Sequence, residues 1–263
     1  MSVVGRVDSL WRFPVKSMRG EELAEAYLGY GGVLGDRICA FHDTAARKAL
    51  PFLTARVQEQ MLRFTPRFRH GARAAQPVNL ADAEGLGPGV TPVYPSRDDL
   101  ALDVETPSGA TLAVDDPALI DALSDGLEDG HALSLLRSDR SLTDCRPVSL
   151  FSMQTVRQIG EEVGRPLDKR RFRANVYADF GAMAGFAEEE LIGRRLRLGE
   201  RAVIALVERD PRCKMITLDP DTAEANPEIL RKVAHGHGGF AGLYGVVLTE
   251  GTVRRGDVIE VLG

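Results

Sequence analysis

The sequence predicts a mainly β protein with some helices (α+β class), built as two β-barrel-like domains. Three observations lead to this prediction: many short runs of β-branched and aromatic residues, turn residues between these runs, and only a few stretches with helical periodicity. A sheet of alternating strands and helices would need a helix after most strands, and the pattern does not provide them. We place the domain boundary after residue 118, which gives segments 1–118 and 119–263.

The first segment is predicted to be rich in short strands. The run GYGGVLGD (residues 29–36) indicates a hairpin or a tight loop, and Thr-Pro-Ser-Gly (residues 106–109) indicates a second turn. Residues 71–98 have few large apolar side chains and many Ala, Gly and Pro residues, so we predict mostly loop there. The predicted strands cover residues 3–12, 22–30, 37–42, 101–105 and 111–114.

Beyond residue 115 the pattern predicts helices as well as strands. One helix begins near Pro117, with Asp115 or Asp116 as its N-cap and apolar residues at helical spacing. Two more helices are predicted over residues 152–163 and 227–233. The predicted strands cover residues 172–177, 195–198, 202–207, 214–218, 243–248 and 258–262.

Composition and charge are those of an ordinary globular protein. The chain of 263 residues is 44% hydrophobic and has a formal net charge of −5, which gives no electrostatic reason to expect a nucleic-acid partner. It has no apolar run long enough to span a membrane, and its first residues lack the pattern of a signal peptide. We therefore expect a cytoplasmic protein with no membrane span and no nucleic-acid partner.

Cysteine content limits the redox chemistry of the chain. Cys39, Cys145 and Cys213 are far apart in the sequence and form no CxxC pair. They are too few for a disulfide framework, and an all-cysteine iron–sulfur cluster needs four thiolates. If the chain transfers electrons, these must arrive through another protein or a cofactor.

Cys213 is the main candidate for chemistry. It follows an apolar stretch at residues 203–207, and Pro211 predicts an irregular segment before the next strand. Arg212 and Lys214 flank the thiol, and nearby cations favour the thiolate, which is the form that binds metals and attacks electrophiles. A structural cysteine is the alternative interpretation, because free cysteine often packs as a small core residue.

Two loop segments contain residues suited to an anion. Lys16 and Ser17 follow Pro14 at the end of the first predicted strand, where a charge and a hydroxyl together can hold a phosphate. Arg37 begins a later predicted strand, directly after Gly35 and Asp36. Taken alone, each residue is equally compatible with a solvated loop.

The basic run KRRFRAN (residues 169–175) precedes an apolar stretch. Strand alternation would place Arg171, Arg173 and Asn175 on one face of the strand. Arginine can clamp a phosphate with two hydrogen bonds, and an amide can bind the edge of a heterocycle. We therefore expect Arg173 and Asn175 to contact one ligand, with a solvated charge run as the alternative.

Together these motifs resemble the MOSC-domain proteins, named after the C-terminal domain of molybdenum cofactor sulfurase. The architecture is similar to that of the mitochondrial amidoxime-reducing component and its bacterial relatives, in which a MOSC-type β-barrel domain precedes the MOSC domain. FPVKS and GDR resemble the N-terminal domain of that group. The motifs that resemble the MOSC domain itself are RRFRAN, DPRCKMITLDPDT and GTVRRGDVIEVLG.

The resemblance implies a molybdenum cofactor (molybdenum bound to molybdopterin) and the reduction of N-hydroxylated small molecules. It implies that Cys213 ligates molybdenum and that an external electron-donor protein, a ferredoxin-type or flavin-type reductase, restores the reduced metal. The start of the helix after residue 151 is also expected near the cofactor, where helix N-terminal amides favour a phosphate. The implied cofactor contacts are Lys16, Ser17, Arg37, Ser152, Thr155, Arg173, Asn175 and Arg212.

The chain also departs from the family pattern. Many relatives have a small residue and a serine before the Arg-Cys pair, where this chain has Asp210 and Pro211. An acidic residue there could change substrate choice or supply a proton. We expect no pyridoxal phosphate, because no sulfurase domain is recognisable. A carrier that holds sulfur or the pterin cofactor without turnover is an alternative, whereas a thiol-dependent transferase would need a base beside Cys213 that the sequence does not place.

Overall fold

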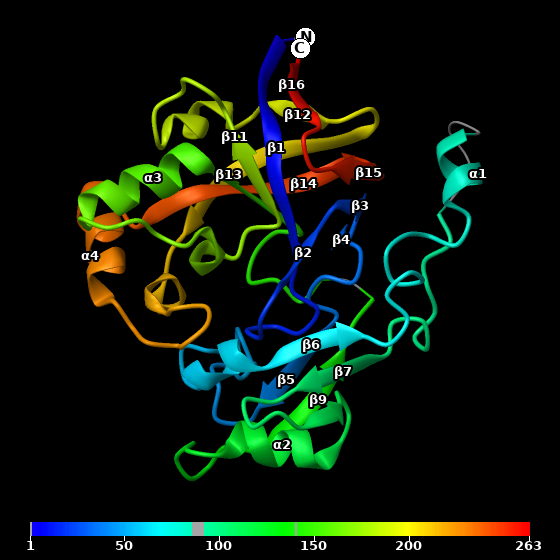
Figure 1. Ribbon diagram of the computed structural model, residues 1–263, viewed down its shortest axis with the longest axis vertical. Helices are drawn as coiled ribbons and strands as arrows, with labels where there is room; N and C mark the ends of the chain where they lie inside the picture. The colour runs from blue at the N-terminus through cyan, green and yellow to red at the C-terminus, as the bar shows by residue number, and fades with distance from the viewer. Residues whose placement is uncertain (1, 86–91, 140) are drawn as a thin grey trace.

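Strands dominate the fold and form two modules stacked along the long axis of the molecule (Figure 1). The structure, a computed structural model, describes residues 2–85, 92–139 and 141–263. Within these ranges, four α-helices and several short 3₁₀ helices accompany the strands. The predicted mainly β class with some helices is confirmed.

The upper module in Figure 1 is a closed barrel, for which the described residues provide seven strands in the order β11-β10-β14-β13-β12-β16-β1. Pairing of β1 with β11, with Leu10 opposite Val176, closes the barrel. Apolar side chains such as Leu150, Leu196 and Ile259 fill its interior. The bounds are β1 Ser2–Arg12, β10 Val148–Ser152, β11 Val176–Asp179, β12 Arg195–Leu198, β13 Ala202–Pro211, β14 Phe240–Thr249 and β16 Val258–Leu262.

The lower module contains smaller sheets around a second apolar core. One sheet pairs β5 with β9, and another is an antiparallel meander of β6, β7 and β8. Buried side chains of this core include Phe41, Met61, Val104 and Leu119. The bounds are β5 Cys39–Asp43, β6 Thr65–Phe68, β7 Leu102–Glu105, β8 Thr111–Ala113, β9 Leu133–Arg137 and the 3₁₀ helix η1 Glu59–Arg63.

Four short strands of the described part of the chain lie outside the seven-stranded barrel and the sheets of the lower module. β2 (Glu21–Leu23) pairs with the end of β1, whereas β3 (Glu25–Gly29) lies between β4 (Gly32–Val33) and β15 (Gly251–Arg254). The β3–β4 hairpin confirms the turn predicted at residues 29–36. The single strand predicted over residues 22–30 is wrong, because β2 and β3 belong to different sheets.

The predicted helices are present, and side-chain caps explain where three of them begin. Asp116 caps α2 (Pro117–Ser124), Ser152 caps α3 (Met153–Glu162) and Asn226 caps α4 (Pro227–Gly236). α3 and α4 lie together on one side of the barrel (Figure 1). A short helix, α1 (Leu80–Gly85), interrupts the predicted loop at residues 71–98, of which residues 86–91 lie outside the described residues.

Of two strands predicted near the candidate site, the one at residues 172–177 begins four residues later than predicted, as β11 at Val176, and the one at residues 214–218 is wrong. Residues 169–172 form the 3₁₀ helix η2 (Lys169–Phe172), which Asp168 caps and which ends at Arg173 in a left-handed conformation. The strand predicted at residues 214–218 is the 3₁₀ helix η4 (Lys214–Thr217), with Cys213 as its N-cap residue. In both places apolar residues pack inward from a tight turn, which the period-two pattern does not distinguish from a strand. The strand before Cys213 is also longer than predicted, because β13 continues to Pro211.

Strands from each predicted segment complete the sheets of the other. β1 belongs to the barrel, and β9, which follows residue 118, pairs with β5 in the lower module. The boundary between segments 1–118 and 119–263 therefore stays a prediction. Residues 141–147 lead to β10 of the barrel, and Thr143, Asp144 and Arg146 of this segment line the cavity described below.

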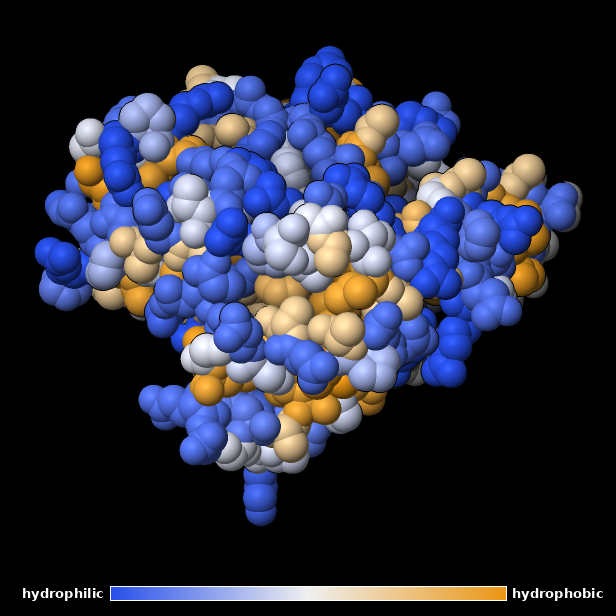
Figure 2. All heavy atoms as spheres, turned by 60° about the horizontal axis from the view of Figure 1, so that its bottom comes forward, coloured by the Kyte–Doolittle hydropathy of each residue, from blue (hydrophilic) through white to orange (hydrophobic). Residues whose placement is uncertain are grey.

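Polar side chains cover most of the face that Figure 2 shows. Figure 2 shows the face at the bottom of Figure 1, where hydrophilic side chains surround a band of apolar atoms. Among the helices of the described ranges, none combines the length and apolar character that a membrane crossing requires.

Candidate functional site

A cavity lies where the open end of the barrel meets the lower module. Seven of the nine predicted site residues line it, although they come from segments far apart in the sequence. The end of β13 and the segment that follows β1 contribute to its wall. The seven predicted residues that the structure brings together are Lys16, Ser17, Arg37, Arg173, Asn175, Arg212 and Cys213.

The cavity is strongly cationic although the chain as a whole is acidic. Among the described residues that line it, seven are lysine or arginine and two are aspartate, whereas the whole chain has a net charge of −5. Such a concentration of positive charge in a concave site attracts an anionic ligand. The cations are Lys16, Arg37, Arg56, Arg146, Arg171, Arg173 and Arg212, and the carboxylates are Asp144 and Asp210.

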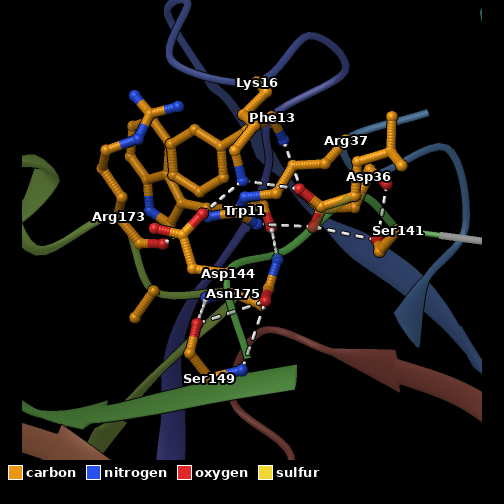
Figure 3. A network of polar contacts seen from close by, with 12 residues as sticks. Trp11, Phe13, Lys16, Asp36, Arg37, Ser141, Asp144, Ser149, Arg173 and Asn175 are labelled. Carbon is orange, nitrogen blue, oxygen red and sulfur yellow. Dashed lines mark hydrogen bonds and ion pairs between the residues drawn. The ribbon is translucent and has the colours of Figure 1, made fainter. Parts of the chain in front are cut away.

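Lys16 is held inside the cavity by the backbone that surrounds it. Its N–H donates to the Cys39 carbonyl at 2.8 Å, so the segment after β1 runs beside β5. Its side chain is buried, and Nζ donates to the Leu142 carbonyl at 2.7 Å and pairs with the Asp144 carboxylate (Figure 3). Burial lowers the pKa of Lys16, and Asp144 offsets part of this effect.

Asp144 is the acidic partner that fills part of this positive cavity. Burial raises its pKa, but the charge and hydrogen bond of Lys16 outweigh that effect, so the pKa of Asp144 lies below its usual value. The charges of Arg56 and Arg37 act in the same direction. Asp144 is therefore ionised at neutral pH and neutralises only part of the surrounding positive charge.

Arg37 is fixed by an internal ion pair. Its Nη1 lies 2.5 Å from Oδ2 of Asp36, whose side chain is fully buried and also accepts from the Phe13 N–H at 2.8 Å. Nη2 of Arg37 donates to the Arg173 carbonyl at 3.0 Å. The GDR motif thus joins the end of β1 to the turn that carries Arg173, as Figure 3 shows.

Arg173 forms no ion pair with a carboxylate in the described part of the chain, although the charges of Asp36 and Asp144 act on it from a distance. Its guanidinium lies 4.2 Å from the ring centroid of Phe13, and its Nη2 is buried without a hydrogen-bond partner. Burial, and then the charge of Arg37, lowers the pKa of Arg173 to about 9, so the side chain is still charged at neutral pH. A cation with a buried, unused donor is a binding position for an anion.

Three of the cavity residues have strained backbone conformations. The φ angles of Ser17, Arg37 and Arg173 are 66°, 48° and 53°, in the left-handed region that non-glycine residues rarely adopt. Such conformations persist where the surrounding structure holds a side chain in a required position. The three motifs FPVKS, GDR and RFRAN each place one such residue at the cavity.

Asn175 lines the cavity, but other protein groups already occupy most of the hydrogen-bonding positions of its side-chain amide. Oδ1 accepts from the N–H and the hydroxyl of Ser149, each at 3.2 Å, and Nδ2 donates to the Trp11 carbonyl at 3.3 Å (Figure 3). Asn175 therefore joins β1, β10 and β11 at the end of the barrel. The premise that strand alternation orients Arg171, Arg173 and Asn175 is wrong, because the strand begins only at Val176.

Cys213 is partly exposed and lies in the cavity wall directly after β13. The neighbouring Arg212 donates through Nε to the Ala241 carbonyl at 2.6 Å and through Nη1 to the Phe172 carbonyl at 2.9 Å. Its Nη2 lies 2.7 Å from Oδ2 of Asp210. Arg212 is thus compensated by Asp210, in contrast to Arg173.

Two family models match the chain in succession. The model described as the MOSC N-terminal beta barrel domain matches residues 4–114, and the MOSC domain model matches residues 137–260. The chain belongs to the MOSC-domain family.

Three solved structures of bacterial proteins resemble the chain at low identity. The YUAD protein of Bacillus subtilis is 14% identical, with 98% of this chain and 94% of that chain covered and a TM-score of 0.45. YiiM from Geobacillus stearothermophilus and YiiM from Escherichia coli are each 18% identical over 45% of this chain, with TM-scores of 0.36 and 0.32. This chain covers 55% of the length of each YiiM protein. None of the curated proteins compared with the chain matches it.

In this MOSC protein, Ser152 and Thr155 do not reach the cavity. Both are fully buried, and the Ser152 hydroxyl caps α3 by accepting from the Thr155 N–H at 2.9 Å. The Thr155 hydroxyl donates to Glu188 at 2.6 Å and accepts from the Phe186 N–H at 2.7 Å. These bonds fasten α3 to the loop before β12, so the structure does not support the expected cofactor contacts of Ser152 and Thr155.

Sequence reasoning missed several residues of the MOSC site. Phe13 and Asp36 lie inside the motifs FPVKS and GDR, so the motifs themselves contained the signal. Asp144 lies in the loop after β9, and Tyr244 lies on β14 beside the end of β13. Nothing in the local sequence of these two residues indicates proximity to Lys16 or Cys213, because that proximity results from the tertiary fold.

Proposed function

We propose that this MOSC protein binds the molybdenum cofactor and reduces N-hydroxylated small molecules, with Cys213 as the thiolate ligand of molybdenum. The observation that carries the proposal is the Nη2 atom of Arg173, which is buried without a hydrogen-bond partner, in a cationic cavity that also contains the Cys213 thiol. A pterin cofactor that bears a phosphate combines an anion with a metal that binds soft sulfur ligands.

The residues present fit such a cofactor. Its phosphate would be held by Lys16, Arg37 and Arg173, with the hydroxyl of Ser17 available as a further donor. Nη2 of Arg173 has no partner among the described residues and would gain one. When bound, the cofactor supplies the two-electron redox chemistry that amino-acid side chains do not provide.

The protein's own contribution is to position and neutralise this ligand. Phe13 lies under the guanidinium groups of Arg37 and Arg173, at 4.7 and 4.2 Å from its ring centroid, and so restricts their movement. The Asp36–Arg37 pair fixes one donor before any ligand arrives, which lowers the entropy that binding must remove. An external reductase of ferredoxin or flavin type would deliver the electrons. This partner and the cytoplasmic location are parts of the proposal.

The first test is the metal and pterin content of the protein purified from a molybdenum-replete host. We expect stoichiometric molybdenum and the fluorescence of oxidised pterin. Protein without molybdenum but with a persulfide on Cys213, detected by mass spectrometry, would instead identify a sulfur carrier.

The second test compares two cysteine substitutions. Cys213→Ser should retain pterin, because the cationic residues stay in place, but should lose the reduction of a hydroxylamine or amidoxime. Cys145→Ser is the matched control, since Cys145 is exposed and its thiol donates to Glu208 at 3.1 Å. Full turnover by Cys213→Ser would remove this thiol from the reaction.

A further inference from the structure

Arg56 is a cation of the cavity that forms no ion pair with a carboxylate of the described ranges. Among the seven lysine and arginine residues that line the cavity, Arg173 is the other cation of this kind. The charge of Arg56 acts on Asp144 only from a distance. The five cations that do form ion pairs are joined as Lys16–Asp144, Arg37–Asp36, Arg146–Glu208, Arg171–Asp219 and Arg212–Asp210.

The backbone around Arg56 is fixed, whereas its side chain is held weakly. The Leu53 N–H donates to the Phe41 carbonyl of β5 at 2.8 Å, and the Thr54 carbonyl accepts from the Gln58 N–H at 3.0 Å. The side chain of Arg56 has one long hydrogen bond, from Nε to the Thr54 hydroxyl at 3.4 Å. Most of the N–H donors of this guanidinium are therefore available to a ligand.

Arg56 lies beside the segment that carries Cys213. Nζ of Lys214, the residue next to Cys213, donates to the Arg56 carbonyl at 3.1 Å and lies 2.6 Å from Oε1 of Glu59. Arg56 and Cys213 both line the cavity. Arg56 is also partly exposed, whereas Nη2 of Arg173 is buried. Arg56 is thus accessible to a molecule that enters the cavity from solvent and reacts near Cys213.

The two cations without an ion pair suit two different anions. The buried Arg173 is assigned above to the phosphate of the cofactor. Arg56 is then the cation of the described cavity wall that neither an ion pair nor this phosphate occupies. Its planar guanidinium can hold a carboxylate with two parallel hydrogen bonds.

We propose that Arg56 binds an anionic group of the substrate, so that the preferred substrates are N-hydroxylated small molecules that carry a carboxylate. This inference rests on the proposed function and specifies its substrate class. Arg56 supplies one positive charge, which matches one carboxylate. It binds a part of the substrate that does not react, and so determines which N-hydroxylated compounds the cavity accepts.

The test compares two substrates of the cofactor-loaded protein, an aryl amidoxime and the same amidoxime with a carboxylate in the para position. The wild-type protein should have the higher kcat/KM for the carboxylate. Arg56→Met should lower the ratio of the two kcat/KM values by about 10-fold or more, the range of a lost hydrogen bond to a charged group. The loss should appear as a higher KM for the carboxylate, because Arg56 contacts the substrate equally before and during the reaction. Arg56→Lys should restore part of the ratio, since lysine keeps the charge but not the planar pair of donors.

Arg146→Met is the matched control. Arg146 also lines the cavity and is partly exposed, but its Nε lies 2.7 Å from Oε1 of Glu208. This variant removes the same charge from the cavity wall, and we expect it to change the ratio by less than about twofold, as for other exposed ion pairs. An equal loss in both variants would attribute the preference to the overall positive charge and refute a specific role of Arg56.

The molybdenum and pterin content of each variant is a second measurement, independent of turnover. Arg56→Met should retain both at the wild-type level, because the proposed phosphate contacts are other residues. Loss of pterin from Arg56→Met, with the protein still folded by thermal unfolding, would show that Arg56 holds the cofactor and would overturn the inference.

The failure of this inference is distinguishable from that of the proposed function. Wild-type protein without cofactor or turnover refutes the proposed function, and this inference with it. A loaded and active protein that does not prefer the carboxylate, or that keeps its preference in Arg56→Met, refutes the role of Arg56 alone.

Discussion

Replacement of Arg173 should stabilise the ligand-free protein while it weakens anion binding. We choose Arg173→Met, because methionine keeps an unbranched chain against Phe13 and removes the charge. Arg173 has a buried Nη2 without a partner, and no carboxylate among the described residues pairs with it. Arg173 thus lowers the free energy of unfolding of the ligand-free protein.

The size of this effect follows from the burial of the guanidinium. The pKa of Arg173 falls from 12.5 to about 9, which corresponds to a cost of about 5 kcal/mol for the charged form at about 1.4 kcal/mol per pH unit. Water penetration and local relaxation reduce such costs, and the contact with Phe13 returns about 1 kcal/mol. We therefore expect Arg173→Met to raise the free energy of unfolding by about 1–3 kcal/mol.

Arg37→Met is the control, because we expect it to change the free energy of unfolding in the opposite direction. Arg37→Met leaves the fully buried Asp36 without its ion pair, which should lower the free energy of unfolding by about 3–5 kcal/mol. Urea denaturation of both ligand-free variants measures the difference, and calorimetric titration with inorganic phosphate should show weaker binding by both. If Arg173→Met destabilises the protein as much as Arg37→Met does, the guanidinium is compensated and the reasoning is refuted.

Two more predictions concern the framework of the cavity. Gly242 has a φ of +76°, and a Cβ there would lie 2.5 Å from Cδ2 of Phe151, whereas a Cβ at Gly256 (φ +89°) would meet open space. In urea denaturation, Gly242→Ala should therefore cost about 1–3 kcal/mol more than Gly256→Ala, and equal losses would contradict the packing argument. Hydrogen bonding to Arg170 lowers the pKa of Asp221, so the stability it adds is present above the usual carboxyl pKa and is lost as pH falls through the lowered value. Asp221→Asn should flatten the decrease of Tm on the acid side, and an unchanged slope would exclude this ion pair as a source of acid sensitivity.

Local sequence patterns were sufficient to predict the fold class and most of the helices and strands. Strands bounded by turn residues and helices with a side-chain cap, such as Ser152 before α3, have their limits encoded in a few neighbouring residues. The break between β2 and β3 has no such signal, because residues 21–29 change sheets through contacts with β1 and β15. The 3₁₀ helices η2 and η4 resemble strands in sequence for a related reason, since packing from several elements decides their conformation.

The site could be predicted residue by residue only where a motif carries the residue. Lys16, Arg37, Arg173 and Cys213 lie in such motifs, and the structure brings them together. Which arginine lacks a counter-charge could not be predicted, because compensation depends on distant carboxylates as well as on neighbours. For the same reason the sequence does not indicate that Asp144, which lies in the segment before β10, lies beside Lys16.

The place of β1 in the barrel determines when, during synthesis, the cavity can first exist. Ser2 pairs with Val261, and β1 also pairs with β11, so the barrel closes only after β16 has been made. At a synthesis rate of about 5–20 residues per second, roughly 13–50 s pass between the synthesis of β1 and that of β16. During this time the unpaired backbone groups of β1 are exposed to other chains. Because Lys16 follows shortly after β1, the cavity can close around a ligand only after β16 has been synthesised and has paired with β1.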